Sequence, residues 1–229
     1  MTALKNNAYQ KLALDYDFLT GEGVVESYKN IIGKREGEDI LDLGCGTGTL
    51  LKEYSLKNST YGVDISAQMI KVARKKDRKS KYLVGDITKI KLDKKFDVVV
   101  CAFDTINHLS SLDEWEDLFE KAFLHLKKDG VFVCDFNTPE CLEMAARHRV
   151  VKRSSGVFLT MQPKIENDIC FWEIDRFKKI AFSYWRHEKI VIKQTFYPIE
   201  HVLERLGKYF KRKELAMSEQ KRAYVKAYN

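Results

Sequence analysis

The stretch that decides the fold is "DILDLGCGTGTLLKEY", residues 39–54. A short apolar run is followed by glycines at alternate positions, Gly44, Gly46 and Gly48, and then by the start of a helix. Glycine reaches positive φ angles and leaves room for a ligand beside bare backbone. The first turn of a helix offers unpaired N–H groups to an anion. The stretch therefore predicts a strand, a turn and a helix, and the turn is either simply tight or lies against a ligand.

Strands and helices alternate through the first 140 residues. Ser66 is typical of a helix N-cap, and Ser111 with Glu114 three residues later forms a capping-box pattern. Pro139 suits the first position of a further helix. The expected strands are residues 39–43, 60–64, 81–85, 96–103 and 130–136. Because helices separate them, these strands should form a mostly parallel sheet covered on both faces, an α/β fold.

After about residue 150 the pattern changes. Four strand-like stretches follow with no helix between them: "GVFLTMQPKI", "DICFWEIDRF", "KKIAFSYWRH" and "KIVIKQTFY". They predict an antiparallel sheet, and "WRHEKIV", residues 185–191, is read as its hairpin turn. "YPIEHVLERLGKYF" then predicts a helix, and two short strands close the chain. The antiparallel block is interpreted as an insertion in a single domain.

Composition narrows the class of protein. Hydrophobic residues make up 45% of the 229 residues, which is enough for a sizeable core. No apolar run reaches the length of a membrane helix, and the N-terminus shows no secretory pattern. The five cysteines are odd in number, widely spaced and mostly within apolar runs, which indicates buried free thiols in a reducing compartment. We therefore expect a cytoplasmic protein.

The positive charge is concentrated at one end of the sequence. Residues 150–229 hold 17 Lys and Arg against 9 Asp and Glu, a net charge of +8. Residues 1–149 hold 23 against 24. This segment either attracts an anionic partner, such as RNA, a phosphate or a sugar nucleotide, or is simply a solvated surface.

The residues around the glycines limit what the turn could bind. A P-loop would need a lysine after Gly48, and a dinucleotide fingerprint would need a glycine at Thr49. Asp64 ends the second strand at the same sheet edge, where a carboxylate can accept hydrogen bonds from both hydroxyls of a ribose. After the third strand, Asp86 could accept from an exocyclic amine. These features suggest a nucleoside.

Further residues around that nucleoside can be named. The backbone N–H of Ile87 could donate to a ring nitrogen. Ile65 and Met69 could enclose an adenine, or could equally be core residues.

At this point the sequence resembles a known family. "ILDLGCGTGTL", "YGVDIS", "VGDITKI", "FDVVVCAFDTINHL" and "LKKDGVFVCDF" stand in the order and spacing of the class I S-adenosylmethionine-dependent methyltransferases. The resemblance covers about residues 38–137. It implies a doubly wound, Rossmann-like sheet of seven mostly parallel strands with an antiparallel insertion after the fifth. It also implies S-adenosylmethionine as the cofactor and S-adenosylhomocysteine as its product.

The resemblance also implies cofactor-binding residues and a division of the chain. The methionine part would lie against the turn, the ribose on Asp64, the adenine on Asp86 and Ile87, and Ala102 and Phe103 would touch the cofactor through their backbone. The expected cofactor-binding residues are Tyr16, Gly44, Cys45, Gly46, Gly48, Asp64, Ile65, Met69, Asp86, Ile87, Ala102 and Phe103. The expected parts are an N-terminal helical cap (1–36), the cofactor-binding core (37–149), an antiparallel insertion or lid (150–197), and the final helix and strands (198–229).

The segment after the fourth strand indicates the class of methyl acceptor. No proline occurs before Pro139, so the Asn/Asp-Pro-Pro-aromatic motif of adenine and glutamine methyltransferases is absent. "CAFDTINHL" instead resembles small-molecule methyltransferases, including those that methylate amino sugars. That resemblance implies that His108 and Tyr9 lie near the acceptor, His108 to orient or deprotonate it. His108 could alternatively just cap a loop.

Three functions stay open at this point. The first is methyl transfer to a nitrogen or oxygen of a small molecule. The second is RNA methylation through the basic C-terminal region. The third is a protein that binds S-adenosylmethionine without transferring methyl. No metal-ligand spacing is found, no membrane contact is expected, and the insertion could form a homodimer contact.

Overall fold

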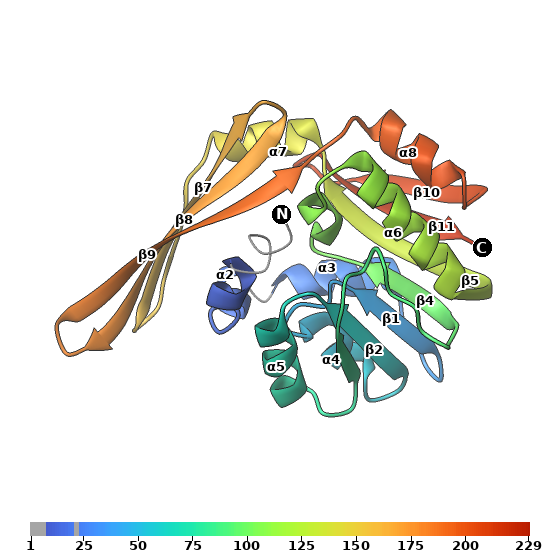
Figure 1. Ribbon diagram of the computed structural model, residues 1–229, viewed down its shortest axis with the longest axis horizontal. Helices are drawn as coiled ribbons and strands as arrows, with labels where there is room; N and C mark the ends of the chain where they lie inside the picture. Colours follow the sequence, from blue (N-terminus) through green and yellow to red (C-terminus); the bar gives the residue numbers. More distant parts are fainter. Residues whose placement is uncertain (1–7, 21–22) are drawn as a thin grey trace.

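A computed structural model describes residues 8–20 and 23–229, and its centre is a seven-stranded sheet (Figure 1). The strands are β1 (Asp39–Leu43), β2 (Ser59–Asp64), β3 (Lys81–Val84), β4 (Phe96–Cys101), β5 (Leu126–Asn137), β10 (Arg212–Met217) and β11 (Arg222–Tyr228). Their order across the sheet is β10-β11-β5-β4-β1-β2-β3. The first five strands are parallel, and β11 runs antiparallel to both β5 and β10. The predicted seven-stranded, mostly parallel α/β fold is confirmed.

Helices cover both faces of this sheet, because successive side chains of a buried strand point to opposite faces. One face carries α3 (Gly23–Ile32), α4 (Thr49–Tyr54) and α5 (Ala67–Lys76). The other carries α6 (Leu112–His125) and α8 (Ile199–Gly207). Along β4, Val98 and Val100 pack in the apolar core beneath α3, α4 and α5, while Val99 and Cys101 pack in the core beneath α6 and α8. The sheet is therefore doubly wound.

The predicted helix caps are present. The Ser66 hydroxyl accepts a hydrogen bond from the Met69 N–H, and the Ser111 hydroxyl accepts one from the Glu114 N–H. The Glu114 carboxylate reaches back to the N–H of Ser110, one residue before the cap. Helix α7 (Pro139–Ala146) starts with proline in its first turn, behind Thr138 as N-cap. Local sequence thus fixes these helix starts.

A second, antiparallel sheet forms the insertion and is called the insertion sheet. Its strands are β6 (Val150–Arg153), β7 (Val157–Glu166), β8 (Ile169–Ala181) and β9 (Tyr184–Thr195), paired in that order. In Figure 1, β8 and β9 extend far from the seven-stranded sheet. The hairpin turn predicted at 185–191 was wrong, because that stretch pairs along β8 and the chain reverses at residues 182–183. One contact that supports this strand pairing is the ring of His187 in β9, which stacks on the ring of Phe177 in β8.

The N-terminal segments bury apolar side chains against the insertion sheet. Residues 8–12 are helical, and α2 (Tyr16–Thr20) follows after a turn. Leu12 and Leu19 share an apolar cluster with Ile174 and Ile190 of the insertion sheet. A buried ion pair reinforces the contact, with Arg176 Nη1 2.9 Å from a carboxylate oxygen of Asp15. Residues 1–7 and 21–22 of the predicted N-terminal cap lie outside the described residues.

The five cysteines are free thiols, and all except the half-buried Cys141 are buried. This arrangement agrees with the sequence-based interpretation. Within residues 8–20 and 23–229, no helix is long and apolar enough to cross a membrane.

Candidate active site

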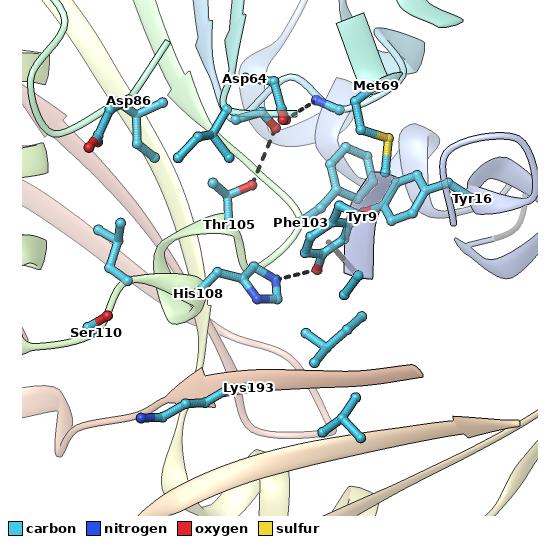
Figure 2. Close-up of a pocket in the computed structure, with 18 of the residues that line it drawn as sticks. Tyr9, Tyr16, Asp64, Met69, Asp86, Phe103, Thr105, His108, Ser110 and Lys193 are labelled. Carbon is cyan, nitrogen blue, oxygen red and sulfur yellow. Dashed lines mark hydrogen bonds between the residues drawn. The ribbon is translucent and has the colours of Figure 1, made fainter. Parts of the chain in front are cut away.

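A cavity of about 440 Å³ lies where the carboxyl ends of β1, β2 and β4 meet the N-terminal segments and β9 (Figure 2). This is the edge at which open parallel sheets bind ligands, and the volume suits a small molecule. Most of the predicted site residues line it: Tyr9, Tyr16, Gly44, Gly46, Asp64, Ile65, Met69, Asp86, Ile87, Phe103 and His108. The structure thus gathers side chains from five separate stretches of sequence around one space.

Three predicted cofactor residues do not line this cavity. Ala102 is buried with its side chain in the core between the sheet and α3. Cys45 packs against Gly62 and borders only a smaller adjoining hollow of about 250 Å³. Gly48 lines neither space. The turn therefore faces the cavity with only part of its length.

The three glycines of the turn serve two different purposes. A Cβ on Gly44 would lie 2.2 Å from Thr105 Cγ2, and a Cβ on Gly48 would lie 2.4 Å from the Tyr82 hydroxyl. These two glycines allow close packing of protein against protein, which corrects the expectation that Gly48 faces a ligand. At Gly46 a Cβ would meet only the Tyr16 ring, 3.8 Å away, so its backbone is bare toward the cavity. Gly46 is the glycine that fits a ligand lying against the turn.

Asp64 stands at the end of β2 with both carboxylate oxygens facing backbone donors. Oδ2 accepts from the Gly46 N–H at 2.9 Å, and Oδ1 accepts from the Ser66 N–H at 2.8 Å. Burial raises the pKa of Asp64, and these two hydrogen bonds partly offset that rise. Each oxygen keeps a further lone pair, so the group can still accept from a vicinal diol. The Asp64 carboxylate is drawn at the top of Figure 2.

Asp86 and Ile87 line the cavity beyond β3. Burial alone would raise the pKa of Asp86, but hydrogen bonds from Thr88 and the charge of Lys89 lower it. Asp86 is thus an acceptor-only carboxylate at neutral pH, as an exocyclic amine requires. Together with Ile65 and Met69, these residues make an apolar end of the cavity with one acceptor, which suits a purine.

The chain leaves β4 through two non-glycine residues in the left-handed region, Phe103 with φ 60° and Asp104 with φ 49°. Such residues cost about 1–3 kcal/mol each and persist only where their surroundings hold them. Here the Tyr28 hydroxyl accepts from the Phe103 N–H at 2.9 Å, and Asp135 accepts from the Asp104 N–H at 3.0 Å. The bend turns the Phe103 ring to the cavity and starts the short helix η1 (Thr105–His108).

Tyr9 and His108 meet inside the cavity, although 99 positions separate them. The Tyr9 hydroxyl lies 2.7 Å from His108 Nε2. Burial is the main cause of the raised pKa of Tyr9, and the nearby Tyr16 and Asp104 add to it. Tyr9 therefore stays a neutral phenol at physiological pH and can donate its proton toward the histidine. Figure 2 shows this hydrogen bond between the two rings.

Helix α2, which carries Tyr16, is tied to the glycine turn by a polar cluster. Asp17 accepts from Thr47 at 2.5 Å and from Thr49 at 3.0 Å, and Lys76 Nζ lies 2.5 Å from its other oxygen. Burial would raise the pKa of Asp17, but these partners lower it, so the carboxylate stays charged. The cluster holds the Tyr16 ring over Gly46.

Several cavity residues were not predicted from sequence: Ala8, Thr105, Leu109, Ser110, Phe171, Val191, Ile192 and Lys193. Half of these come from the insertion sheet, whose alternation of apolar and polar residues identifies a strand but not the face toward the site. Thr105 lies beside the turn, where its hydroxyl donates to the Ala102 carbonyl at 2.7 Å. Within residues 8–20 and 23–229, no group of three or more His, Cys, Asp or Glu side chains could hold a metal ion.

Comparison with known proteins identifies the central part of the chain. A family described as "Methyltransferase domain" matches residues 40–130. These residues form a methyltransferase domain. The match covers the glycine turn, Asp64, Asp86 and His108, so the cofactor half of the cavity lies within the methyltransferase domain.

A curated relative supports the same assignment. The dTDP-3-amino-3,6-dideoxy-alpha-D-glucopyranose N,N-dimethyltransferase of Streptomyces fradiae is 32% identical over 97 residues, which is 42% of this chain and 38% of that protein. The chain spans about half or less of the length of curated relatives such as this one. The alignment therefore reports on the methyltransferase domain and not on the whole protein.

Solved structures extend the likeness to nearly the whole chain. A S-adenosylmethionine-dependent methyltransferase from Clostridium acetobutylicum ATCC 824 superposes with a TM-score of 0.78, at 22% identity over 96% of this chain and 98% of that one. The sugar N-methyltransferase KedS8 from Streptoalloteichus sp ATCC 53650 gives a TM-score of 0.77, at 22% identity over 93% and 92%. At this identity the comparison shows the fold, which includes the insertion sheet around the methyltransferase domain.

Proposed function

We propose that this chain is a S-adenosylmethionine-dependent N-methyltransferase whose acceptor is a small amino sugar linked to an anionic group. One observation carries the proposal. A single cavity joins the Asp64 and Gly46 end, which fits a nucleoside, to the Tyr9–His108 pair, which fits a reacting amine. A protein that only binds the nucleoside would need no hollow beside it. The undivided cavity therefore favours catalysis over simple binding.

The chain's own residues can hold the cofactor. Asp64 would accept from its ribose hydroxyls, Asp86 from its adenine amine, and Gly46 would leave room for its methionine part beneath the Tyr16 ring. When bound, S-adenosylmethionine supplies a methyl group already activated on a positively charged sulfur. The protein then has to align the acceptor and exclude water, and alignment can lower a barrier by about 7–11 kcal/mol.

The Tyr9–His108 pair can prepare an amine acceptor. Amines are largely protonated at neutral pH, so the nitrogen must lose a proton before it can act as a nucleophile. A proton can pass from the ammonium to the Tyr9 oxygen while the Tyr9 proton passes to His108 Nε2, 2.7 Å away. Asp104, with one oxygen 3.9 Å from the same nitrogen, would stabilise the resulting imidazolium.

The side of the cavity formed by β9, together with the names of the relatives, supports the proposed class of acceptor. Lys193 and Ser110 line the side contributed by β9 and by the loop after η1 (Figure 2). A lysine and a hydroxyl there suit a phosphate or another anion on the acceptor. The Streptomyces fradiae relative is named for a dTDP-linked amino sugar, and KedS8 is named as a sugar N-methyltransferase. Both names agree with a nitrogen acceptor on a sugar.

The test is methyl transfer with a defined pair of acceptors. Purified protein is incubated with methyl-labelled S-adenosylmethionine and either a dTDP-linked amino sugar or the same compound with a hydroxyl in place of the amine. We expect label only in the amine. His108→Asn should lower turnover about 100-fold while binding of S-adenosylhomocysteine changes little. Lys193→Ala should raise KM for the dTDP-linked compound without changing KM for S-adenosylmethionine.

The same assay includes total RNA as a competing acceptor. Label in RNA, with none in either sugar, would replace this proposal by RNA methylation through the basic C-terminal region. Binding that weakens steeply with salt would then be expected as well.

A further inference from the structure

Gln194 is a buried side chain of the insertion sheet that reaches the proposed catalytic pair. It lies near the end of β9, opposite Cys170 of β8, and its residue exposure is 2%. Its amide nitrogen donates to Asp104 Oδ2 and lies 3.4 Å from His108 Nε2. Gln194, 86 positions after His108 in sequence, therefore faces the same His108 nitrogen that is hydrogen-bonded to Tyr9.

The orientation of this amide is fixed by its neighbours. Trp172 Nε1 lies 2.8 Å from Gln194 Oε1, and an indole N–H can only donate. Asn137 Nδ2 donates to the same oxygen at 3.3 Å. The Gln194 oxygen must therefore face Trp172, and its NH₂ group must face Asp104 and His108. A flipped amide would place its NH₂ group against the Trp172 N–H and its oxygen against the Asp104 carboxylate.

This orientation decides which nitrogen of His108 carries the proton. Nε2 faces the NH₂ group of Gln194, which can only donate, and the hydroxyl of Tyr9 at 2.7 Å. A proton on Nε2 would point at the Gln194 NH₂ group, which cannot accept it, whereas an unprotonated Nε2 can accept from both that amide and the Tyr9 hydroxyl. The neutral ring should therefore carry its proton on Nδ1.

We propose that Gln194 is a positioning residue that holds neutral His108 in the Nδ1–H tautomer, with its Nε2 lone pair directed at Tyr9. The insertion sheet would then build part of the proton-accepting machinery as well as enclose the acceptor. This role rests on the proposed function for its consequence in catalysis, but the tautomer itself is a property of the protein without substrate.

Replacing Gln194 by a neutral side chain leaves the charged groups around the pair in place, so the amide is the part that discriminates. Asp104 is bonded to Arg222 at 2.6 Å, and Arg222 also bonds Asp135. Tyr9 and Tyr16 are neutral, because burial raises the pKa of both hydroxyls. A positive Arg222 beside two carboxylates changes little when Gln194 is replaced by a neutral side chain. The effect of Gln194→Leu on His108 is therefore that of losing one directed donor.

The test is nitrogen NMR of the protein labelled with ¹⁵N-histidine, without any ligand. The chain has five histidines, and His108→Asn identifies the His108 resonances by their absence. At a pH where the ring is neutral, we expect Nδ1 at the position of a protonated nitrogen and Nε2 at that of an unprotonated one. In Gln194→Leu the two should move toward each other, as the tautomers mix.

The matched control is Gln162→Leu, a glutamine of β7 in the same sheet whose oxygen bonds Arg149. It should leave the His108 resonances unchanged. If Gln194→Leu does not fold, Trp172→Phe retains Gln194 but removes the closer of the two donors that orient it, and should shift the same resonances in the same direction. Nε2–H in the wild type would overturn the proposal, and so would unchanged resonances in the folded variant.

The kinetic readout separates this proposal from the proposed function. With an active acceptor, Gln194→Leu should lower kcat about tenfold and leave binding of S-adenosylhomocysteine within about a factor of two. An equal loss of both would indicate a merely structural role and overturn the proposal. If the NMR result holds but no sugar is methylated, the proposed function fails while the assignment of the tautomer stands.

Discussion

At the scale of single residues, two carboxylates beside the glycine turn show what burial does in this protein. Asp64 keeps its hydrogen bonds to backbone N–H groups and faces the cavity, whereas Asp42 is 2% exposed. One Asp42 oxygen has no hydrogen-bond partner among the described residues. Burial, with a smaller contribution from the charge of Asp64, raises the pKa of Asp42 to about 8. The two aspartates should therefore respond differently to substitution.

Asp64→Ala should weaken binding of S-adenosylhomocysteine by about 1–3 kcal/mol, because the ribose would lose charge-assisted hydrogen bonds. Titration calorimetry measures this directly and needs no acceptor. Asp93→Ala, which removes an exposed aspartate, should leave the affinity unchanged. Equal affinities for the wild type and Asp64→Ala would remove Asp64 from the proposed site.

Asp42 should make the protein less stable as the pH rises. Its pKa is about 8 in the folded protein against an ordinary 3.8, so the folded state holds a proton that the unfolded chain releases. The stabilisation is complete below about pH 4 and is lost as the pH approaches 8. Asp42→Asn should remove this dependence and raise the free energy of unfolding at pH 8 by on the order of 1–3 kcal/mol.

Urea unfolding at pH 5 and at pH 8 measures this effect, with Asp93→Asn as the control for loss of a charge. A variant whose stability changes with pH as steeply as that of the wild type would show that Asp42 is not the group responsible.

At the scale of elements, the structure shows which elements can be predicted from sequence and why. The turn glycines, the caps at Ser66 and Ser111 and the alternation of apolar residues depend on neighbours in sequence, so the central sheet and the cofactor half of the cavity were predictable. Gln194 and Lys193 reach the site only through pairing between distant strands. Nothing in "KIVIKQTFY" shows which of its faces meets the cavity, so the acceptor half was largely missed.

Helix α2 depends on one carboxylate for its position on the turn. Asp17→Asn should weaken the contacts to Thr47, Thr49 and Lys76, because the charge that draws the ammonium and the hydroxyls is lost. We expect amide hydrogen exchange in α2 to become faster, and the affinity for S-adenosylhomocysteine to fall about three- to tenfold as the Tyr16 ring loosens.

Glu36→Gln is the matched control, since it breaks the Glu36–Lys57 ion pair, in which both side chains are 66% exposed. That change should alter neither quantity. Unchanged exchange in α2 of the Asp17 variant would mean that apolar packing alone holds the helix.

At the scale of the whole molecule, the turn of the β8–β9 hairpin stands apart from the rest of the fold (Figure 1). Phe182 is 93% exposed and Tyr184 70% exposed, and Ile180 and Trp185 beside them are also exposed. The sequence leaves open a homodimer contact through the insertion, and this turn offers an apolar surface for it.

Sedimentation over a range of concentrations should therefore show a dimer for the wild type and a monomer for the double variant Phe182→Ser, Tyr184→Ser. The exposed loop position Asp93→Ser serves as the control. Identical sedimentation of the wild type and the double variant would place any dimer contact elsewhere.

The seven-stranded sheet and the insertion sheet enclose one cavity between them, so the two ends of the cavity can change separately. A chimera that exchanged residues 150–195 for those of another methyltransferase would keep the nucleoside end intact and replace one wall of the acceptor end. Such a graft should change which acceptor is methylated only if it also carries the Trp172–Gln194 pair, placed to meet Asn137 and Asp104 of the remaining chain. Without these hydrogen bonds, the new wall would enclose the intended acceptor, but His108 would no longer be held in the proposed tautomer.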